Sequence, residues 1–317
     1  MVACRMNTTS RPHQPVLLRE AIDSLSIQPQ GIYVDATFGR GGHSQHILSQ
    51  LNKAGRLIIL DKDPAAILHA RQFFAQDPRV SIYHASFAQL QEILAQEKLL
   101  TRVSGILFDL GVSSPQLDEA QRGFSFMREG KLDMRMNHLR GVDAATWLAA
   151  VSETELARVL FEYGEERFSR RIARAIVEAR RETPIQTTTQ LRDLVAKAMP
   201  TRPKDKHPAT RTFLAIRIVI NQELEELQLG LEQALDALMV GGRLSVISFH
   251  SLEDRIVKRF IQHHERGDHL PPDLPVKHHT LQQKLKRIGR AVHPTDEEVA
   301  ANPRARSAIL RIAEKQP

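Results

Sequence analysis

The chain has 317 residues but only one cysteine, Cys4. A single cysteine excludes an internal disulfide, a cysteine-rich zinc site and an iron–sulfur cluster, and it fits a reducing compartment. The sequence also lacks an apolar run long enough to span a membrane, and no signal-peptide core is visible. We therefore expect a cytoplasmic protein that has no membrane partner.

Acidic side chains are fewer than basic ones, so that the formal net charge is +7. This excess favours a polyanionic partner such as nucleic acid, although mild basicity is common among soluble proteins. Hydrophobic residues make up 42% of the chain and charged residues 26%, which is typical of a globular protein. The length suits one large α/β domain with a smaller unit.

A glycine-rich segment, residues 31–44, is the strongest local pattern. An apolar run ends at Asp35, a turn with three glycines follows, and a helical pattern begins near Ser44. Glycines in such a turn let backbone N–H groups approach a ligand. The dinucleotide fingerprint requires glycine where this chain has Ser44, whereas Asp35 suits a ligand with an amino group or positive centre. S-adenosylmethionine has both, and other nucleotides are the alternative.

Acidic residues end three apolar runs that we predict to be parallel strands. Residues 56–61 end at Asp61 and residues 105–109 end at Asp109, as the first run ends at Asp35. The carboxyl ends of parallel strands lie at one edge of a sheet, so the three acids should line one crevice. Asp61 is placed to accept the ribose hydroxyls of an adenosine, although a helix cap is the alternative. Asp63, which precedes a proline, is more typical of a cap.

Two further candidates follow predicted strands. Phe87 comes after residues 80–84 and can either lie against an adenine or fill the core. His250 follows the strand at 243–249 and is a candidate base or positioning residue, while helix capping is the alternative role of nearby Glu253.

The alternation of strands and helices stops near residue 121 and resumes with one long helix predicted over 212–238. We interpret 123–206 as an inserted helical domain that recognises substrate, with 1–122 and 207–317 as one discontinuous domain. Within the insertion, arginines on the helix at 166–181 either contact phosphates or form a solvated face. These are Arg170, Arg171, Arg174, Arg180 and Arg181.

Three aromatic residues of the insertion, a histidine-rich segment and the C-terminal tail also need interpretation. Phe124, Phe126 and Trp147 could stack on a flipped base, but core packing is the alternative. The histidines in 262–281 lack the spacing and companions of a metal site, so this segment is interpreted as a surface loop without metal. The tail, 285–292 with 307–312, is predicted to be a hairpin that closes the sheet.

Eight motifs together resemble the MraW (RsmH) family of ribosomal RNA methyltransferases, in the same order and over nearly the whole chain. They are DATFGRGGHS (35–44), DLGVSSPQ (109–116), RGFSF (122–126), LDMRM (132–136), YGEE (163–166), HPATR (207–211), SFHSLEDR (248–255) and NPRARS (302–307).

The resemblance implies a Rossmann-like class I methyltransferase domain with an inserted all-helical domain. It implies S-adenosylmethionine-dependent methylation of the exocyclic N4 of a cytidine in the decoding centre of 16S rRNA, in the small ribosomal subunit. A homodimer is compatible with the sequence. Asp109 and His250 are the candidate catalytic residues. Besides Asp35, the expected cofactor contacts are Gly41, Gly42, His43, Asp61, Phe87, Asp109 and Gln116.

The chemistry of an amine target agrees with the residues present. The N4 lone pair of cytosine is delocalised into the ring, so an acceptor for the N4 hydrogens would localise it and help to remove a proton. Asp109 or a backbone carbonyl in 110–114 could be that acceptor. Methylation at C5 would instead need a thiolate, and Cys4 is remote from every motif.

Two other functions remain to be distinguished from this one. A Rossmann oxidoreductase would retain NAD rather than S-adenosylmethionine. A noncatalytic RNA-binding ribosome-assembly factor would keep its role after Asp109 is replaced.

Overall fold

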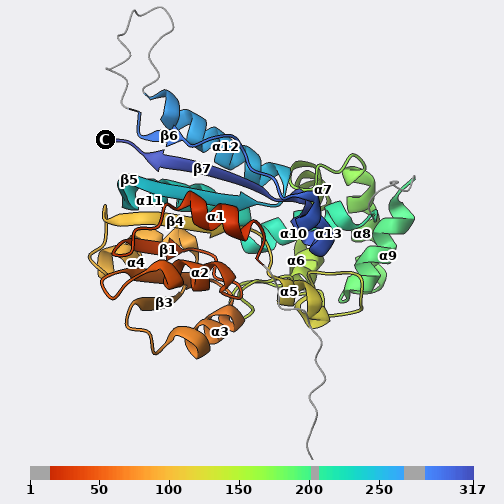
Figure 1. Cartoon of the computed structure of the whole chain (residues 1–317). Helices are drawn as coiled ribbons and strands as arrows, with labels where there is room; N and C mark the ends of the chain where they lie inside the picture. Colours follow the sequence, from red (N-terminus) through yellow and green to blue (C-terminus); the bar gives the residue numbers. More distant parts are fainter. Residues whose placement is uncertain (1–14, 201–206, 268–282) are drawn as a thin grey trace, which may run out of the picture.

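A seven-stranded sheet forms the centre of the protein in a computed structural model that describes residues 15–200, 207–267 and 283–317 (Figure 1). The strand order is β3-β2-β1-β4-β5-β7-β6. Neighbours among β1 to β5 pair in parallel, whereas β7 runs antiparallel to β5 and β6. The strands are β1 (Ile32–Asp35), β2 (Arg56–Asp61), β3 (Val80–His84), β4 (Val103–Asp109), β5 (Leu238–Ser248), β6 (Leu285–Arg287) and β7 (Ile309–Lys315). This topology confirms the Rossmann-like class I methyltransferase fold. Cys4 and the histidines His269, His278 and His279 lie outside the described residues.

Both faces of the parallel strands are buried under helices. Alternate residues point to opposite faces: Tyr33 and Leu57 join one apolar cluster, whereas Val34 and Ile58 join the other. The first cluster contains residues of α1 (Leu18–Ser24), α2 (Gly42–Gln50) and α3 (Pro64–Phe74). The second contains residues of α4 (Leu90–Gln96), α11 (Glu223–Ala237) and α12 (Ser251–Arg266). The chain reverses its direction of winding between β1 and β4, where the loops after the strands separate and leave room for a ligand.

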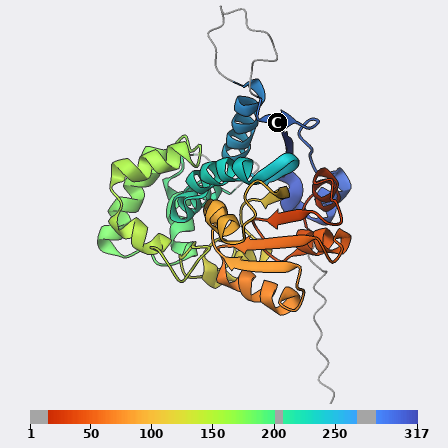
Figure 2. The same cartoon turned by 90° about the vertical axis from the view of Figure 1, so that its left-hand side faces the viewer.

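A third apolar cluster, from Phe124 to Ile216, belongs to helices beside the sheet (Figures 1 and 2). Its helices are α6 (Ala144–Ala150), α7 (Glu153–Glu162), α8 (Ser169–Glu182), α9 (Thr188–Ala198) and α10 (Thr210–Asn221). The short helix α5 (Ser114–Asp118) leads from β4 toward this region. Because α10 packs into the third cluster through Phe213 and Ile216, we propose that the inserted unit extends to the end of α10.

The predicted single helix over 212–238 is wrong. The chain forms two helices, α10 and α11, which are separated at Gln222, where φ is +51°. The predicted loop from residue 262 is also too long, because α12 continues to Arg266 and contains His263 and His264.

The C-terminal hairpin is confirmed by the antiparallel pairing of β6 and β7, with the short helix α13 (Asp296–Ala301) between them. No helix in the described part of the chain is both long and apolar enough to cross a bilayer.

Candidate active site

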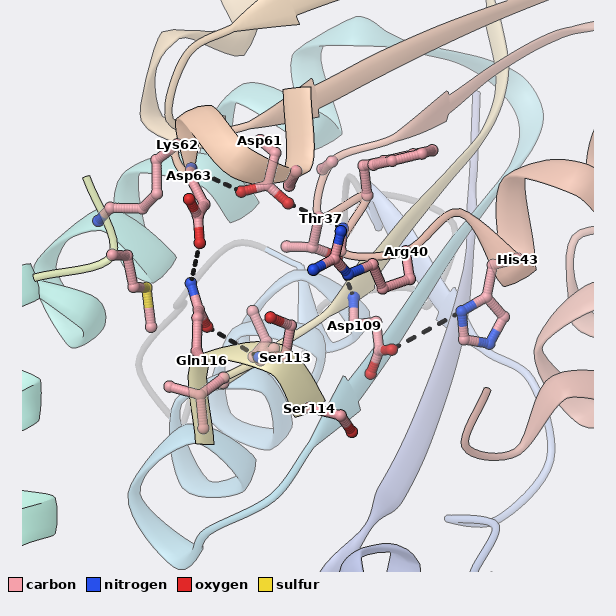
Figure 3. A pocket seen from close by; sticks show the side chains of 18 of the residues that line it. Thr37, Arg40, His43, Asp61, Lys62, Asp63, Asp109, Ser113, Ser114 and Gln116 are labelled. Carbon is pink, nitrogen blue, oxygen red and sulfur yellow. Dashed lines mark hydrogen bonds and ion pairs between the residues drawn. The ribbon is translucent and has the colours of Figure 1, made fainter. Parts of the chain in front are cut away.

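A cavity of about 690 Å³ opens at the carboxyl edge of the parallel strands (Figure 3). Loops after β1, β2, β3 and β4 line it together with the first turn of α11. Seven residues expected from the sequence lie in the lining: Gly41, Gly42, His43, Asp61, Phe87, Asp109 and Gln116. Asp35 and His250, the other two, lie outside the lining among the described residues.

The glycine loop is shaped by backbone conformation and by close packing. Gly39 and Gly41 have φ angles of +55° and +77°, which favour glycine. A Cβ on Gly41 would lie 2.5 Å from the Phe38 ring, and one on Gly42 would lie 2.0 Å from Pro15. Any other residue at these two positions would therefore displace the wall of the cavity.

Asp35 anchors the glycine loop through hydrogen bonds outside the cavity lining. Its Oδ2 accepts a hydrogen bond from Ser44 Oγ at 2.6 Å, and its Oδ1 accepts one from the Thr37 N–H at 3.2 Å. Burial raises the pKa of this carboxyl to about 6, although both hydrogen bonds favour the ionised form. The contacts describe a residue that joins β1 to α2.

Asp61 joins the ends of β1 and β2. Its carboxylate accepts the Gly39 N–H and the Asp63 N–H, each at 2.8 Å, and it also lines the cavity. Burial raises the pKa of Asp61 to about 6. Carboxylate oxygens have further lone pairs, so Asp61 can still accept hydroxyl donors from a ligand.

Asp63 caps α3, as expected, by accepting the Ala65 N–H at 2.9 Å. Its second oxygen accepts Gln116 Nε2 at 2.7 Å and Arg122 Nη1 at 3.0 Å. Gln116 Oε1 in turn accepts the Ser113 N–H at 2.8 Å. Gln116 therefore fixes the loop after β4 to the loop after β2 (Figure 3), a link that sequence reasoning missed.

His43 and Asp109 face each other across the cavity wall. The imidazole Nε2 lies 3.2 Å from the Val16 carbonyl, which only accepts, so this nitrogen carries the proton. Burial lowers the pKa of His43 to about 4, and the neutral ring then presents the Nδ1 lone pair to Asp109 Oδ2 at 3.7 Å.

The carboxyl of Asp109 is short of hydrogen-bond donors. Its Oδ1 is buried without a partner among the described residues. Burial, followed by the charges of Asp35 and Glu253, raises the pKa of Asp109 well above its usual value. A ligand that brings positive charge and N–H donors would satisfy both Asp109 and His43.

Phe87 contributes an aromatic ring to the cavity wall. Phe87 packs edge-to-face on Phe108 with ring centroids 5.3 Å apart, and a Cβ on Gly230 would lie 2.7 Å from the Phe87 ring. Beside it, Glu226 accepts Lys62 Nζ at 2.6 Å and Ser86 Oγ at 2.8 Å. Glu226 and Lys62 were not expected from the sequence, because they come together only through the fold.

His250 caps α12 through its side chain. Its Nδ1 accepts the Glu253 N–H at 3.4 Å, and its Nε2 lies 3.1 Å from Glu253 Oε1. Glu253 also accepts the Phe249 N–H at 2.9 Å, which confirms the capping role considered for it. His250 is thus placed to orient Glu253, which lines the cavity.

The three aromatic residues considered for stacking lie in or against the helical core. Phe124 is buried in that core, and Phe126 and Trp147 pack against it. The centroid of the Phe126 ring lies 4.9 Å from the ring centroid of His207 and 4.9 Å from that of Phe213. These contacts favour the core-packing alternative.

A family model described as the MraW methylase family matches residues 10–316. The chain belongs to this family. A ribosomal RNA small subunit methyltransferase H from Nitrosococcus oceani is 57% identical over 98% of this chain and 99% of its own length. The enzyme of the same name from Pseudoalteromonas atlantica is 55% identical over 97% of this chain and 99% of its own length. An rRNA methylase structure from Streptococcus thermophilus covers 98% of this chain and 99% of its own, with 12% identity and a TM-score of 0.45.

S-adenosyl-L-methionine is the cofactor of the MraW methylases, and the cavity fits it. The Oδ2 of Asp109 and the Nδ1 of His43, which face each other, are acceptors for an ammonium group. The ring of Phe87 in the cavity wall suits contact with an aromatic base.

Proposed function

We propose that this protein methylates the exocyclic N4 of a cytidine in the decoding centre of 16S rRNA, within the small ribosomal subunit. The names of the two relatives support a small-subunit RNA substrate. The observation that carries the amine target is the orphaned Oδ1 of Asp109 at the cavity wall, an acceptor without a donor.

Different walls of the cavity would hold different parts of the cofactor. Asp109 and His43 would accept the ammonium group, Asp61 the ribose hydroxyls, and Phe87 would contact the adenine. Bound there, S-adenosylmethionine supplies a methyl group activated by the positive sulfonium. Gln116 holds the loop after β2 and the loop after β4 at a fixed separation through its hydrogen bonds to Asp63 and Ser113.

The protein's main task is to align the amine for in-line displacement. Asp109 Oδ1, or a backbone carbonyl in 110–114, accepts an N4 hydrogen and so localises the nitrogen lone pair. The proton that N4 would release on methylation would pass to the carboxylate of Asp109 or to solvent, because a backbone carbonyl can orient the amine but is too weak a base to keep the proton. The target base must leave its stack to reach this position.

Mass mapping of rRNA nucleosides from a deletion strain tests the proposal. Loss of one N4-methylated cytidine from 16S rRNA, restored by the wild-type gene and not by Asp109→Asn, is the expected result. Unchanged nucleosides in the deletion strain would refute the function. Full restoration by Asp109→Asn would instead favour the noncatalytic assembly factor or a backbone acceptor.

A further inference from the structure

The break between α10 and α11 is held in place by side-chain hydrogen bonds. Gln222 adopts a left-handed conformation that is unfavourable for a residue with a side chain. Next to it, Asn221 accepts the Met136 N–H and donates to the Met134 carbonyl, both at 2.7 Å. A strained and well-anchored backbone at a cavity wall is a reason to look for a functional side chain there.

The break brings Arg217 and Glu223 together at the cavity. Arg217 donates from Nε and Nη2 to the two carboxylate oxygens of Glu223, each at 2.8 Å. Both side chains line the cavity, with exposed fractions of 15% and 8%. Since a buried ion pair contributes little net stability, the pair is better explained by the orientation that it gives to Arg217. The third guanidinium nitrogen, Nη1, is not used by Glu223.

This pair lies on the Asp109 side of the cavity. One carboxylate oxygen each of Glu223 and Glu253 and one ring nitrogen of His250 all lie within 4.8 Å of one another. The charge of Glu253 acts on both Arg217 and Asp109, which places all three groups in one neighbourhood. The Lys62–Glu226 pair beside Phe87 is a separate ion pair, in which Glu226 lies about one turn after Glu223 on α11. Glu223, His250 and Glu253 could in principle hold a cation, but Arg217 already engages both oxygens of Glu223.

We propose that Arg217, oriented by Glu223, donates hydrogen bonds to the N3 and O2 edge of the target cytosine. This inference rests on the proposed function. A guanidinium only donates, so it matches the two acceptors of cytosine, whereas uracil presents an N–H at N3. Arg217 thereby reads the base and holds its N4 toward Asp109. Glu223 acts as a positioning residue.

Steady-state methylation of small subunits from the deletion strain tests the role of Arg217. For Arg217→Lys and Glu223→Gln, we expect kcat to fall roughly 10- to 100-fold, the effect of losing charge-assisted hydrogen bonds. The KM for subunits should change less than about threefold because phosphate contacts dominate RNA affinity. The two variants together should lose little more than either alone.

The matched control is Arg311→Lys. Arg311 forms a bidentate ion pair with Asp254, like that of Arg217 with Glu223, but outside the cavity lining. Both side chains of this pair are 17% exposed. It should keep wild-type kcat. Wild-type kcat in both Arg217→Lys and Glu223→Gln would overturn the proposal. A fall in the affinity for S-adenosylmethionine as large as the fall in kcat, measured by calorimetry, would also overturn the proposal, because Arg217 would then contact the cofactor. An equal loss in Arg311→Lys would show a general effect on folding.

Subunits reconstituted with 3-deazacytidine at the methylated position test the contact itself. This analogue keeps N4 and O2 but replaces N3 by C–H. The ratio of kcat for cytidine over 3-deazacytidine should be at least about tenfold smaller in Arg217→Lys than in wild type. Equal ratios would refute the contact. Absence of N4-methylcytidine with the natural substrate would refute the proposed function instead.

Discussion

Nδ1 of His43 lies 3.7 Å from Oδ2 of Asp109, and both atoms are hydrogen-bond acceptors when Asp109 is ionised (Figure 3). The imidazole is fixed as an acceptor because its other nitrogen faces a backbone carbonyl. Two facing acceptors are unfavourable until a donor comes between or beside them. The pair is therefore built for a ligand that carries N–H donors and a positive charge.

The first prediction concerns cofactor affinity. Asp109→Asn keeps the shape of the side chain but removes its charge and one acceptor. We expect affinity for S-adenosylmethionine to fall about tenfold or more, as measured by calorimetry at pH 7.5, because a charge-assisted hydrogen bond is lost. Glu314→Gln, at the distant ion pair with Arg243, is the control and should bind normally. An unchanged affinity in Asp109→Asn would remove Asp109 from the ammonium site.

The second prediction concerns the pH dependence of methyl transfer. A proton acceptor works only when ionised, so kcat/KM should rise with pH through the pKa of Asp109 in the free enzyme. That pKa is raised by burial and then by the charges of Asp35 and Glu253. Asp35→Asn removes one of these charges without altering the cavity lining. The acidic limb of the profile should therefore move to lower pH.

Its control is Asp77→Asn, which removes a partly buried carboxylate that is paired with Arg79 outside the cavity lining. This variant should leave the limb where it is in wild type. A limb that stays in place in Asp35→Asn, or that survives in Asp109→Asn, would mean that another group titrates.

The third prediction concerns stability, again at Asp35. The folded state raises the pKa of this carboxyl from 3.8 to about 6, so it binds the proton more tightly than the unfolded chain. Its stabilising contribution is complete below pH 3.8 and is lost as pH rises through 6. Asparagine does not titrate and can still bond to Thr37 and Ser44. The stability of Asp35→Asn relative to wild type should thus increase by about 1 kcal/mol from pH 5 to pH 7.5, in urea unfolding without cofactor. A constant difference would contradict the raised pKa.

The part of the site that could be predicted from the sequence follows from local pattern and sheet geometry. Apolar runs that end at Asp61 and Asp109 predict parallel strands, and parallel strands bring their carboxyl ends to one edge. The motif match added Gln116 and His43, whose roles no periodicity indicates. The same geometry brought Asp35 to this edge, but its oxygens are engaged by Ser44 and Thr37 behind the lining.

The part that could not be predicted depends on one backbone angle. Helical spacing of apolar residues continues across 212–238, so nothing periodic marks the reversal at Gln222. That reversal is what turns Arg217 and Glu223 toward each other at the cavity wall. Non-local pairs such as Lys62 and Glu226, 164 residues apart, leave no local signal either. A left-handed residue held by tertiary contacts is a feature that only a three-dimensional structure reveals.

The last prediction concerns the arginines of α8. Arg170, Arg171 and Arg174 are exposed on this helix, whereas Arg180 is used within the protein, where it donates to the Leu148 carbonyl. Arg180 is therefore left out of the test. Replacing the other three by glutamine should weaken binding to small subunits. The plot of log affinity against log salt concentration should become shallower by about 2, since each lost phosphate contact reduces the slope by roughly 0.7.

The matched control removes the same charge elsewhere, through Arg19→Gln, Arg71→Gln and Arg102→Gln, which are exposed on the sheet domain. Binding is measured by filter retention of labelled subunits between 50 and about 200 mM KCl, a range over which phosphate contacts dominate. The control should keep the wild-type slope because its arginines lie away from the inserted helices. An equal change of slope in both triple variants would indicate a diffuse attraction by net charge. An unchanged slope in the α8 variant would place the RNA on another face of the protein.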